Sequence, residues 1–351
     1  MQSLWDDEFW LPPNVTWSDL EGTRNGINFR KISDLWYPLF GAGVILVLRF
    51  VIEQKLARPI GIGMGMKANT RRPPRPNPIL EKVYEKTSKP EGRQVDALAK
   101  QTDLSTREVE LWFRKRWLAS KPSTLDKFCE SFWRSVYYTA LYAYSWIILW
   151  DKSWFWDITN CWHLYPLHPM TTDVWWYYMV ELAFYWSLLC SQFFDAKRSD
   201  FYAMFTHHVA TILLLSLSLI CNLFRVGTLV LWVHDCADVF LETAKAFKYA
   251  KYPKTSDVFF YFFAISWIAT RLGYFPTWIL YSITVEAPQF IQYYGAYNVF
   301  SGLLSILLIL NLFWAYHIFK MAYLGFMAPD GRVGKDSRSD SEDESDSPSH
   351  T

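Results

Sequence analysis

The chain has 351 residues, of which 51% are hydrophobic and 19% aromatic, yet its mean hydropathy is only +0.01. These values argue against an ordinary soluble domain and favour several apolar spans separated by polar loops. The formal net charge of +1 excludes little, because a basic segment near residues 55 to 127 offsets an acidic tail after Asp330.

The N-terminal segment, residues 1–35, lacks the basic n-region and cleavage site of a signal peptide, so we expect no part of it to be removed. It contains the one Asn-x-Ser/Thr sequon, at Asn14, which would be a glycosylation site if this segment is lumenal. Residues 36–53 are predicted to hold the first transmembrane helix, closed by Arg49 and Glu53. The five cysteines lie without paired spacing, and therefore predict neither a disulfide framework nor a zinc site.

The next segment, from Gln54 to Lys127, has no predicted span and holds 17 Lys and Arg against eight acidic residues. The positive-inside rule places it in the cytosol. After a Pro-rich linker, two helices are expected within Glu91–Trp117, joined by a turn at Asp103 to Ser105. Ser105 and Glu108 have the spacing of a capping box.

The second of these helices contains Trp112-Phe113-Arg114-Lys115-Arg116 and resembles the third helix of a homeodomain. Lys115 stands where homeodomains place the asparagine that reads adenine, and the first homeodomain helix has no good match. We therefore favour a packing or interaction module over a DNA reader for the homeobox-like segment, residues 67–127, and nucleic acid is disfavoured as a partner.

Further spans are predicted near residues 128–149, 176–194, 205–223, 226–242, 258–281 and 298–320. With the first, they make about seven transmembrane helices in an all-α polytopic membrane protein. Charge bias and the sequon both favour a lumenal N-terminus and a cytosolic C-terminus. The acidic tail, residues 329–351, is predicted to be disordered and phosphorylated by acidophilic kinases at Ser337, Ser339 and Ser341.

The hairpin formed by the spans near 205–223 and 226–242 carries ionisable groups that a bilayer penalises. If its two helices lie antiparallel about a turn near residue 224, Asp238 comes within one helical turn of His207 and His208. His234 and Asp235 lie deeper on the second helix. Glu242 and Lys245 extend the same face toward the cytosol.

Histidines opposite carboxylates suit acid/base or nucleophilic chemistry, with a carboxylate holding the imidazole in one tautomer. A buried polar network that joins two helices is the alternative interpretation. Iron or zinc is disfavoured, because membrane di-iron enzymes need several His boxes and this chain has seven histidines in all. Glu181 and Arg271, also within spans, are expected either to pair with each other or to line a cavity.

Taken together, these motifs resemble the signature of the ceramide synthases, the longevity-assurance homologues. The matching residues are Phe9 to Trp17, Glu181 to Ser187, His207-His208, Asn222, Arg225 to Thr228, His234-Asp235-x-x-Asp238, Leu241-Glu242-x-x-Lys245, Tyr249 and Thr270-Arg271-Leu272. Cys236 departs from the serine usual in the family. The resemblance implies a TLC catalytic domain at residues 127–328, with its spans around a lipid-accessible cavity, and a homeobox-like insert typical of animal members.

The family implies an endoplasmic reticulum enzyme of ceramide biosynthesis that transfers a fatty acyl group from acyl-CoA to the amine of a sphingoid base, sphinganine or sphingosine. No cofactor is expected beyond the acyl-CoA co-substrate. The predicted catalytic residues are His207, His208, Asp235 and Asp238. The predicted supporting residues are His234, Glu242, Glu181 and Arg271, and the predicted CoA contacts are Lys197, Arg198, Lys245 and Lys248.

Two mechanisms fit this chemistry. A histidine acts as general base for direct attack of the amine, or His207 first forms an acyl-imidazole, oriented by Asp238 or Asp235; we favour the second. A non-catalytic TLC-type lipid sensor, a translocon-associated factor and a membrane-tethered regulator remain the alternative functions. The acyl-chain preference, the role of the homeobox-like segment and the oligomeric state stay open, with a homodimer or a heterodimer as options.

Overall fold

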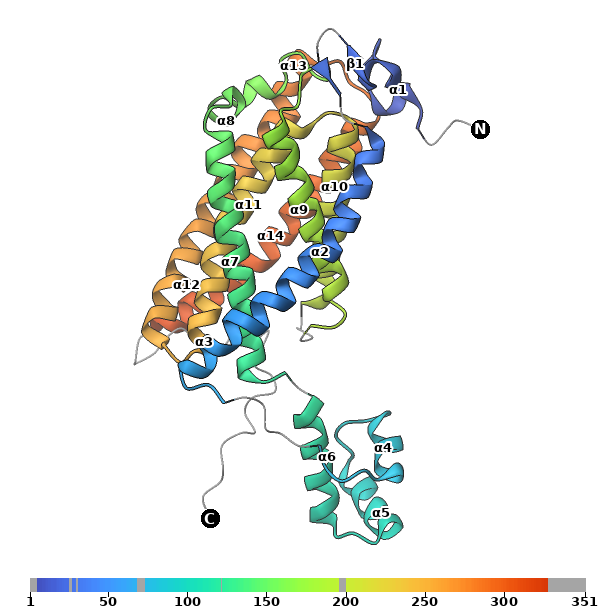
Figure 1. The fold of residues 1–351 in the computed structure, drawn as a ribbon, viewed down its shortest axis with the longest axis vertical. Helices are drawn as coiled ribbons and strands as arrows, with labels where there is room; N and C mark the ends of the chain where they lie inside the picture. Colours follow the sequence, from blue (N-terminus) through green and yellow to red (C-terminus); the bar gives the residue numbers. More distant parts are fainter. Residues whose placement is uncertain are drawn as a thin grey trace.

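The computed structural model describes residues 5–24, 27–29, 31–67, 73–120, 122–195 and 200–327. In this part of the chain, long helices run side by side along one axis (Figure 1). They are α2 (Trp36–Ile52) with its continuations η3 (Glu53–Ala57) and α3 (Arg58–Gly63), α7 (Thr124–Leu149), α9 (Thr172–Ser191), α10 (Phe201–Ile220), α11 (Phe224–Tyr249), α12 (Pro253–Trp267) with the π-helical η5 (Ile268–Leu280) and η6 (Ser282–Glu286), and α14 (Ala296–Met327).

Four helical stretches among the described residues are long and apolar enough to cross a membrane: Ile32–Gly63, Phe201–Ile220, Pro253–Phe290 and Ala296–Leu324. The chain is therefore a multi-pass membrane protein. The other three predicted spans coincide with α7, α9 and α11, whose charged and aromatic side chains lower their hydropathy. The count of seven spans stays a prediction.

Short elements gather at one end of the bundle, which is uppermost in Figure 1. They are α1 (Asp7–Trp10), η1 (Trp17–Leu20), β1 (Thr23–Arg24), β2 (Ile27–Asn28), η2 (Ile32–Leu35), α8 (Ser153–Trp156), η4 (Ile158–Cys161) and α13 (Ala287–Phe290). The two strands pair antiparallel, with Thr23 opposite Asn28. Apart from this small ladder, regular structure in the described residues is helical, as the all-α prediction requires.

The turn between α10 and α11 is anchored at this same end. Asn222 has φ +55°, a left-handed conformation that asparagine tolerates, and its Nδ2 donates to the carbonyl oxygens of Pro166 at 2.5 Å and His168 at 2.9 Å. Arg225 donates to the carbonyl oxygen of Asn160 at 2.6 Å and lies 4.8 Å from the ring centroid of Trp154. These contacts hold the turn against α8, η4 and the loop that follows them, so Arg225 has a structural role.

The homeobox-like segment lies beyond the other end of the bundle and has its own core (Figure 1). It consists of α4 (Pro78–Tyr84), α5 (Gly92–Thr102) and α6 (Thr106–Ser120); the sequence did not predict α4. Trp112 and Phe113 of α6 are buried in this core. The expected capping box is present, and hydrogen bonds from the backbone and hydroxyl of Ser105 lower the pKa of Glu108.

The first span begins at Trp36, as predicted, but helix continues past Ile52 to Gly63. Arg49 does not close the helix, because its guanidinium is paired within the protein. It contacts Asp195 at 2.8 Å and Glu53 at 2.7 Å. These ion pairs neutralise the charge of Arg49 inside the protein, so the helix need not end there. The predicted end of the first helix is therefore corrected.

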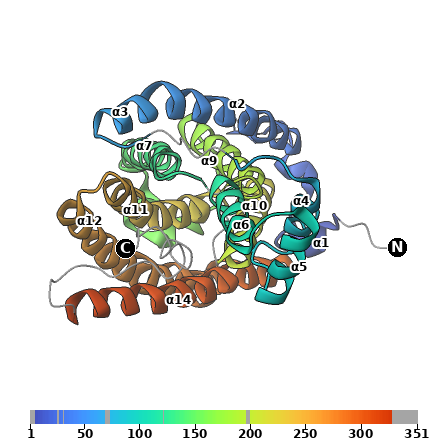
Figure 2. The ribbon, with the colours of Figure 1, turned by 90° about the horizontal axis from the view of Figure 1, so that it is seen from below.

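The two helices of the predicted hairpin are not each other's main partners. α11 packs chiefly against α7 and α12, and α10 packs chiefly against α9 and α14. Seen along the bundle, α2 and α14 lie on opposite sides (Figure 2). Ionisable groups on α10 and α11 therefore meet side chains from helices that a two-helix pairing scheme leaves out.

Candidate active site

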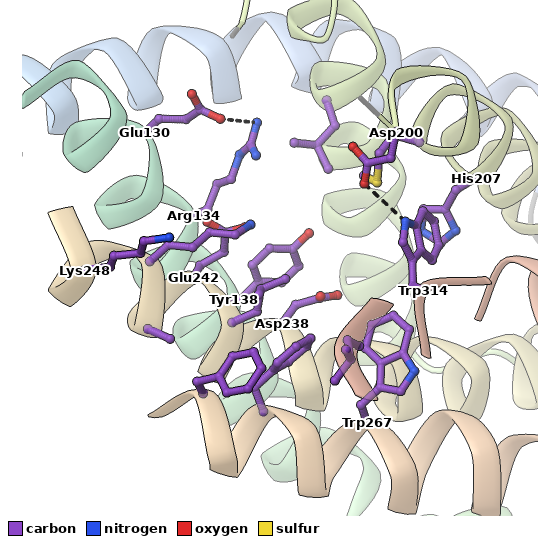
Figure 3. A pocket seen from close by; sticks show the side chains of 18 of the residues that line it. Glu130, Arg134, Tyr138, Asp200, His207, Asp238, Glu242, Lys248, Trp267 and Trp314 are labelled. Atoms are coloured by element: carbon purple, nitrogen blue, oxygen red, sulfur yellow. Dashed lines mark hydrogen bonds and ion pairs between the residues drawn. The ribbon is translucent and has the colours of Figure 1, made fainter. Parts of the chain in front are cut away.

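A cavity of about 330 Å³ opens at the end of the bundle nearer the homeobox-like segment. Its walls come from the first turns of α7 and α10, the end of α9, the whole length of α12, the start of η5, and the last turns of α11 and α14. Figure 3 shows His207 and Trp314 on one wall and Arg134, Glu242 and Lys248 across from them. Apolar side chains, among them Phe260, Phe263 and Trp267, complete the lining.

The predicted histidine pair lies in this cavity. The ring of His207 contacts Trp314 edge-on, with 5.6 Å between centroids, and its Nδ1 has no hydrogen-bond partner among the described residues. His208 is 5% exposed, and its Nδ1 lies 2.9 Å from Oε1 of Gln192. The residue that orients His208 is thus an amide at the end of α9 and not one of the predicted carboxylates.

Asp238 also lines the cavity, but its partner is Arg271. Nη2 of Arg271 donates to Oδ2 of Asp238 at 2.6 Å and to the carbonyl oxygen of His234 at 2.7 Å. The guanidinium lies 4.0 Å from the ring centroid of Trp267. This corrects the prediction that Asp238 is the first partner of the histidines, because a guanidinium in η5 offers a charge-assisted bond that a neutral imidazole cannot match.

Asp235 and Glu181 lie beneath the cavity and do not line it. They are 1% and 0% exposed, their carboxyl groups contact each other, and the hydroxyl of Tyr177 lies beside Glu181. Two ionised carboxylates in such a buried place would repel strongly, and a proton on one of them, shared with the other, would remove that repulsion. Of the two predicted alternatives, pairing of Glu181 with Arg271 is not found, and only Arg271 lines the cavity.

If the two carboxyl groups share a proton, two substitutions of Glu181 should differ in their effect on stability. Glu181→Gln is expected to keep the fold, because its amide can still donate a hydrogen bond to Asp235. Glu181→Leu leaves Asp235 buried without that donor and should lower the free energy of unfolding by about 1–3 kcal/mol. Thermal unfolding in detergent distinguishes the two variants. Equal stability of the two would show that the carboxyl pair does not hold α9 and α11 together.

Both ring nitrogens of His234 are hydrogen-bonded. Its Nδ1 donates to the carbonyl oxygen of Val230 at 2.7 Å, and its Nε2 lies 3.2 Å from Nδ2 of Asn311. Because a carbonyl only accepts, Nδ1 carries the proton and Nε2 accepts from the amide. His234 therefore links α11 to α14 and lies outside the cavity lining.

An ion-pair network that the sequence did not indicate lies at the mouth of the cavity. Asp195 accepts hydrogen bonds from Arg49 and from Arg134, and Arg134 also pairs with Glu130. Burial raises the pKa of Asp195, but the hydrogen bond from Arg49 and the nearby arginine charges outweigh it, and the pKa stays below its ordinary value. The network joins α2, α7 and the end of α9. The acidic and basic residues at the predicted span ends could have indicated ion pairs. The sequence does not show which of them pair, because the paired residues are far apart in the chain.

Of the predicted CoA contacts, Lys245 and Lys248 line the cavity. Nζ of Lys245 donates to Oε1 of Glu242 at 2.7 Å. Lys197 and Arg198 lie outside the described residues, as do Ser337, Ser339 and Ser341. Asn14 is described and is exposed.

Comparison with known proteins places this arrangement in a family. Residues 127–320 match the family model of the TLC domain, and residues 74–121 match that of the homeodomain. The protein is thus of the TLC-domain class of membrane proteins, with a homeodomain ahead of that domain.

Similarity extends over nearly the whole chain. Human ceramide synthase 5 is 42% identical over 97% of this chain and 87% of its own length. Human ceramide synthase 3 is 39% identical over 91% of this chain and 83% of its own, and ceramide synthase hyl-1 of Caenorhabditis elegans is 33% identical over 97% and 84%. The chain belongs to the ceramide synthase family.

Proposed function

We propose that this protein is an acyl-CoA-dependent sphingoid base N-acyltransferase, which joins a fatty acyl group to the amine of sphinganine or sphingosine and so forms ceramide. One observation carries the proposal. A chain related to ceramide synthases along nearly its whole length places two adjacent histidines in a cavity that combines apolar walls with basic residues at its mouth.

The chemistry follows from His207. Its imidazole nitrogen attacks the thioester carbonyl carbon, the C–S bond breaks, and CoA leaves as a thiolate that takes up a proton. The sphingoid amine then attacks the acyl-imidazole carbon, the bond to His207 breaks, and an amine proton passes to a base. Asp238 and Asp235 were the expected orienters of His207. Asp238 is engaged by Arg271, however, and Asp235 by Glu181. Asp238 therefore has the role of holding Arg271 in the cavity wall.

The polar and apolar parts of the two substrates bind to different parts of the cavity. The phosphates of CoA lie toward Lys245 and Lys248 at the mouth, with Lys197 and Arg198 as further contacts. The acyl and sphingoid chains lie against the apolar lining, such as Phe260 and Phe263. Acyl-CoA is the co-substrate, and the reaction takes no other cofactor.

We further propose seven spans in the endoplasmic reticulum membrane. The N-terminal segment is lumenal and glycosylated at Asn14, and the homeobox-like segment, the cavity mouth and the tail phosphorylated at Ser337, Ser339 and Ser341 are cytosolic. The catalytic domain is residues 127–328 and the homeobox-like segment residues 67–127. As partners we propose the two substrates and, as an option, a second synthase chain in a homodimer or a heterodimer.

The test uses purified protein with fatty acyl-CoA and sphinganine. We expect ceramide and free CoA in equal amounts. With acyl-CoA alone, we expect an adduct of acyl mass on the peptide that contains His207, lost when sphinganine is added. No ceramide from the wild type would reject the proposed function, whereas full turnover without an adduct would reject the covalent route and leave direct attack.

A further inference from the structure

Gln192, the residue that ends α9, bridges two positions of α10 at the cavity wall. Its Nε2 donates to the carbonyl oxygen of Phe201 at 2.8 Å, and its Oε1 lies 2.9 Å from Nδ1 of His208. Both Gln192 and His208 line the cavity. The side chain thus links the first turn of α10 to the second histidine of the pair.

These two bonds fix the position of a proton. A backbone carbonyl can only accept, so the amide nitrogen of Gln192 must face Phe201. Its carbonyl oxygen therefore faces His208 and, as an acceptor, requires that Nδ1 of His208 carry a hydrogen. In the neutral ring, Nε2 is then the nitrogen with a free lone pair.

The other histidines of the constellation lack this arrangement. His234 has bonds on both ring nitrogens, so it has no lone pair to offer a substrate. Nδ1 of His207 has no partner among the described residues, so no hydrogen bond there selects its tautomer. His208 combines a fixed tautomer with a place in the cavity.

We propose that Gln192 is a positioning residue, which holds His208 with Nε2 ready to take the proton from the sphingoid amine. This inference rests on the proposed function. In the transfer step, the bond between the amine nitrogen and the acyl carbonyl carbon forms, the bond from that carbon to its leaving group breaks, and one amine proton moves to Nε2 of His208. The leaving group is His207 or, in direct attack, the CoA thiolate.

A neutral amide suits this task. The ring keeps its hydrogen bond to Gln192 when it becomes a cation, because Oε1 still accepts from Nδ1. The charged and titratable groups around His208 are Arg134 of α7, Tyr185 of α9 and His207 of α10. A carboxylate in place of the amide would bind the imidazolium too well, and the proton would be released more slowly after each turnover.

Two variants test the inference. Gln192→Met keeps the side-chain volume but removes both hydrogen bonds, and it should lower kcat for ceramide formation by at least about 10-fold with KM for sphinganine little changed. Gln192→Glu keeps the acceptor and adds a negative charge, which stabilises the imidazolium. The acid limb of its pH profile for kcat/KM should therefore move to higher pH.

Gln289→Met serves as the matched control, because Gln289 lies in α13 at the opposite end of the bundle. Thermal unfolding of each variant shows whether it folds. A folded Gln192→Met enzyme with wild-type kcat, or an unmoved acid limb in Gln192→Glu, would overturn the inference while the wild type still forms ceramide. An inactive wild type would reject the proposed function instead.

Discussion

Replacement of His207 by alanine is expected to abolish ceramide formation, with a loss in kcat of at least about 10³-fold. In the proposed mechanism His207 forms the bond to the acyl group, and His208 is held as the base for the amine proton. The cavity itself should persist, because its other walls come from several helices. Ceramide formation by detergent-purified protein, followed at saturating acyl-CoA, measures the loss.

The matched control is His317→Ala. His317 lies on α14 with its ring 5.0 Å from Phe313 and does not line the cavity. This variant should keep wild-type activity. If His207→Ala folds and retains more than a tenth of wild-type turnover, His207 is not the nucleophile and the acyl group is transferred directly. Mass spectrometry after incubation with acyl-CoA alone is an independent measurement, because the acyl adduct must be absent from His207→Ala.

Arg271→Met is expected to lower both stability and activity strongly. Arg271 is 4% exposed and joins η5 to α11 through Asp238 and the carbonyl oxygen of His234. Removal of its charge leaves the Asp238 carboxylate in a largely buried wall without its partner. Such uncompensated charges cost about 3–5 kcal/mol. Thermal unfolding in detergent measures the loss in stability, and ceramide formation measures the loss in activity.

The double variant Asp238→Asn/Arg271→Met separates structure from chemistry. Without either charge, much of the lost stability should return, since the desolvation cost of an unpaired ion is gone. Activity should stay low, because the wall that faces the histidines no longer has its charged pair. Lys115→Met, at an exposed position of α6, is the control for loss of a cationic side chain. Full stability in Arg271→Met alone would contradict the ion pair as a structural link.

Local patterns predicted those features that depend on local physics. The apolar run from Trp36 to Ile52 predicted the start of the first span, and the spacing of Ser105 and Glu108 predicted a capping box that is present. The short helix α4 was missed, because its seven residues carry too little periodicity beside the Pro-rich linker. The end of α3 was missed because an ion pair to Asp195 removes the need for a helix end at Arg49.

The composition of the candidate site was also readable, because ionisable residues are costly in apolar spans and stand out there. His207, His208 and Asp238 were predicted together, and the structure brings them to one cavity. The hydrogen-bond partners of these residues, and hence their roles, could not be predicted from the sequence. Gln192 is neutral, so it carries no such signal, although it orients His208.

The sequence by itself determined that this is a helical membrane protein of the ceramide synthase family, with its reactive groups near one end of two spans. Only the tertiary structure decided the partners: Arg271 for Asp238, Glu181 for Asp235 and Gln192 for His208. The physical reason is that apolar periodicity and charge are properties of one helix, whereas a hydrogen bond between helices depends on which helices pack together. Here α11 packs against α7 and α12, and this choice moves Asp238 from the histidines to an arginine.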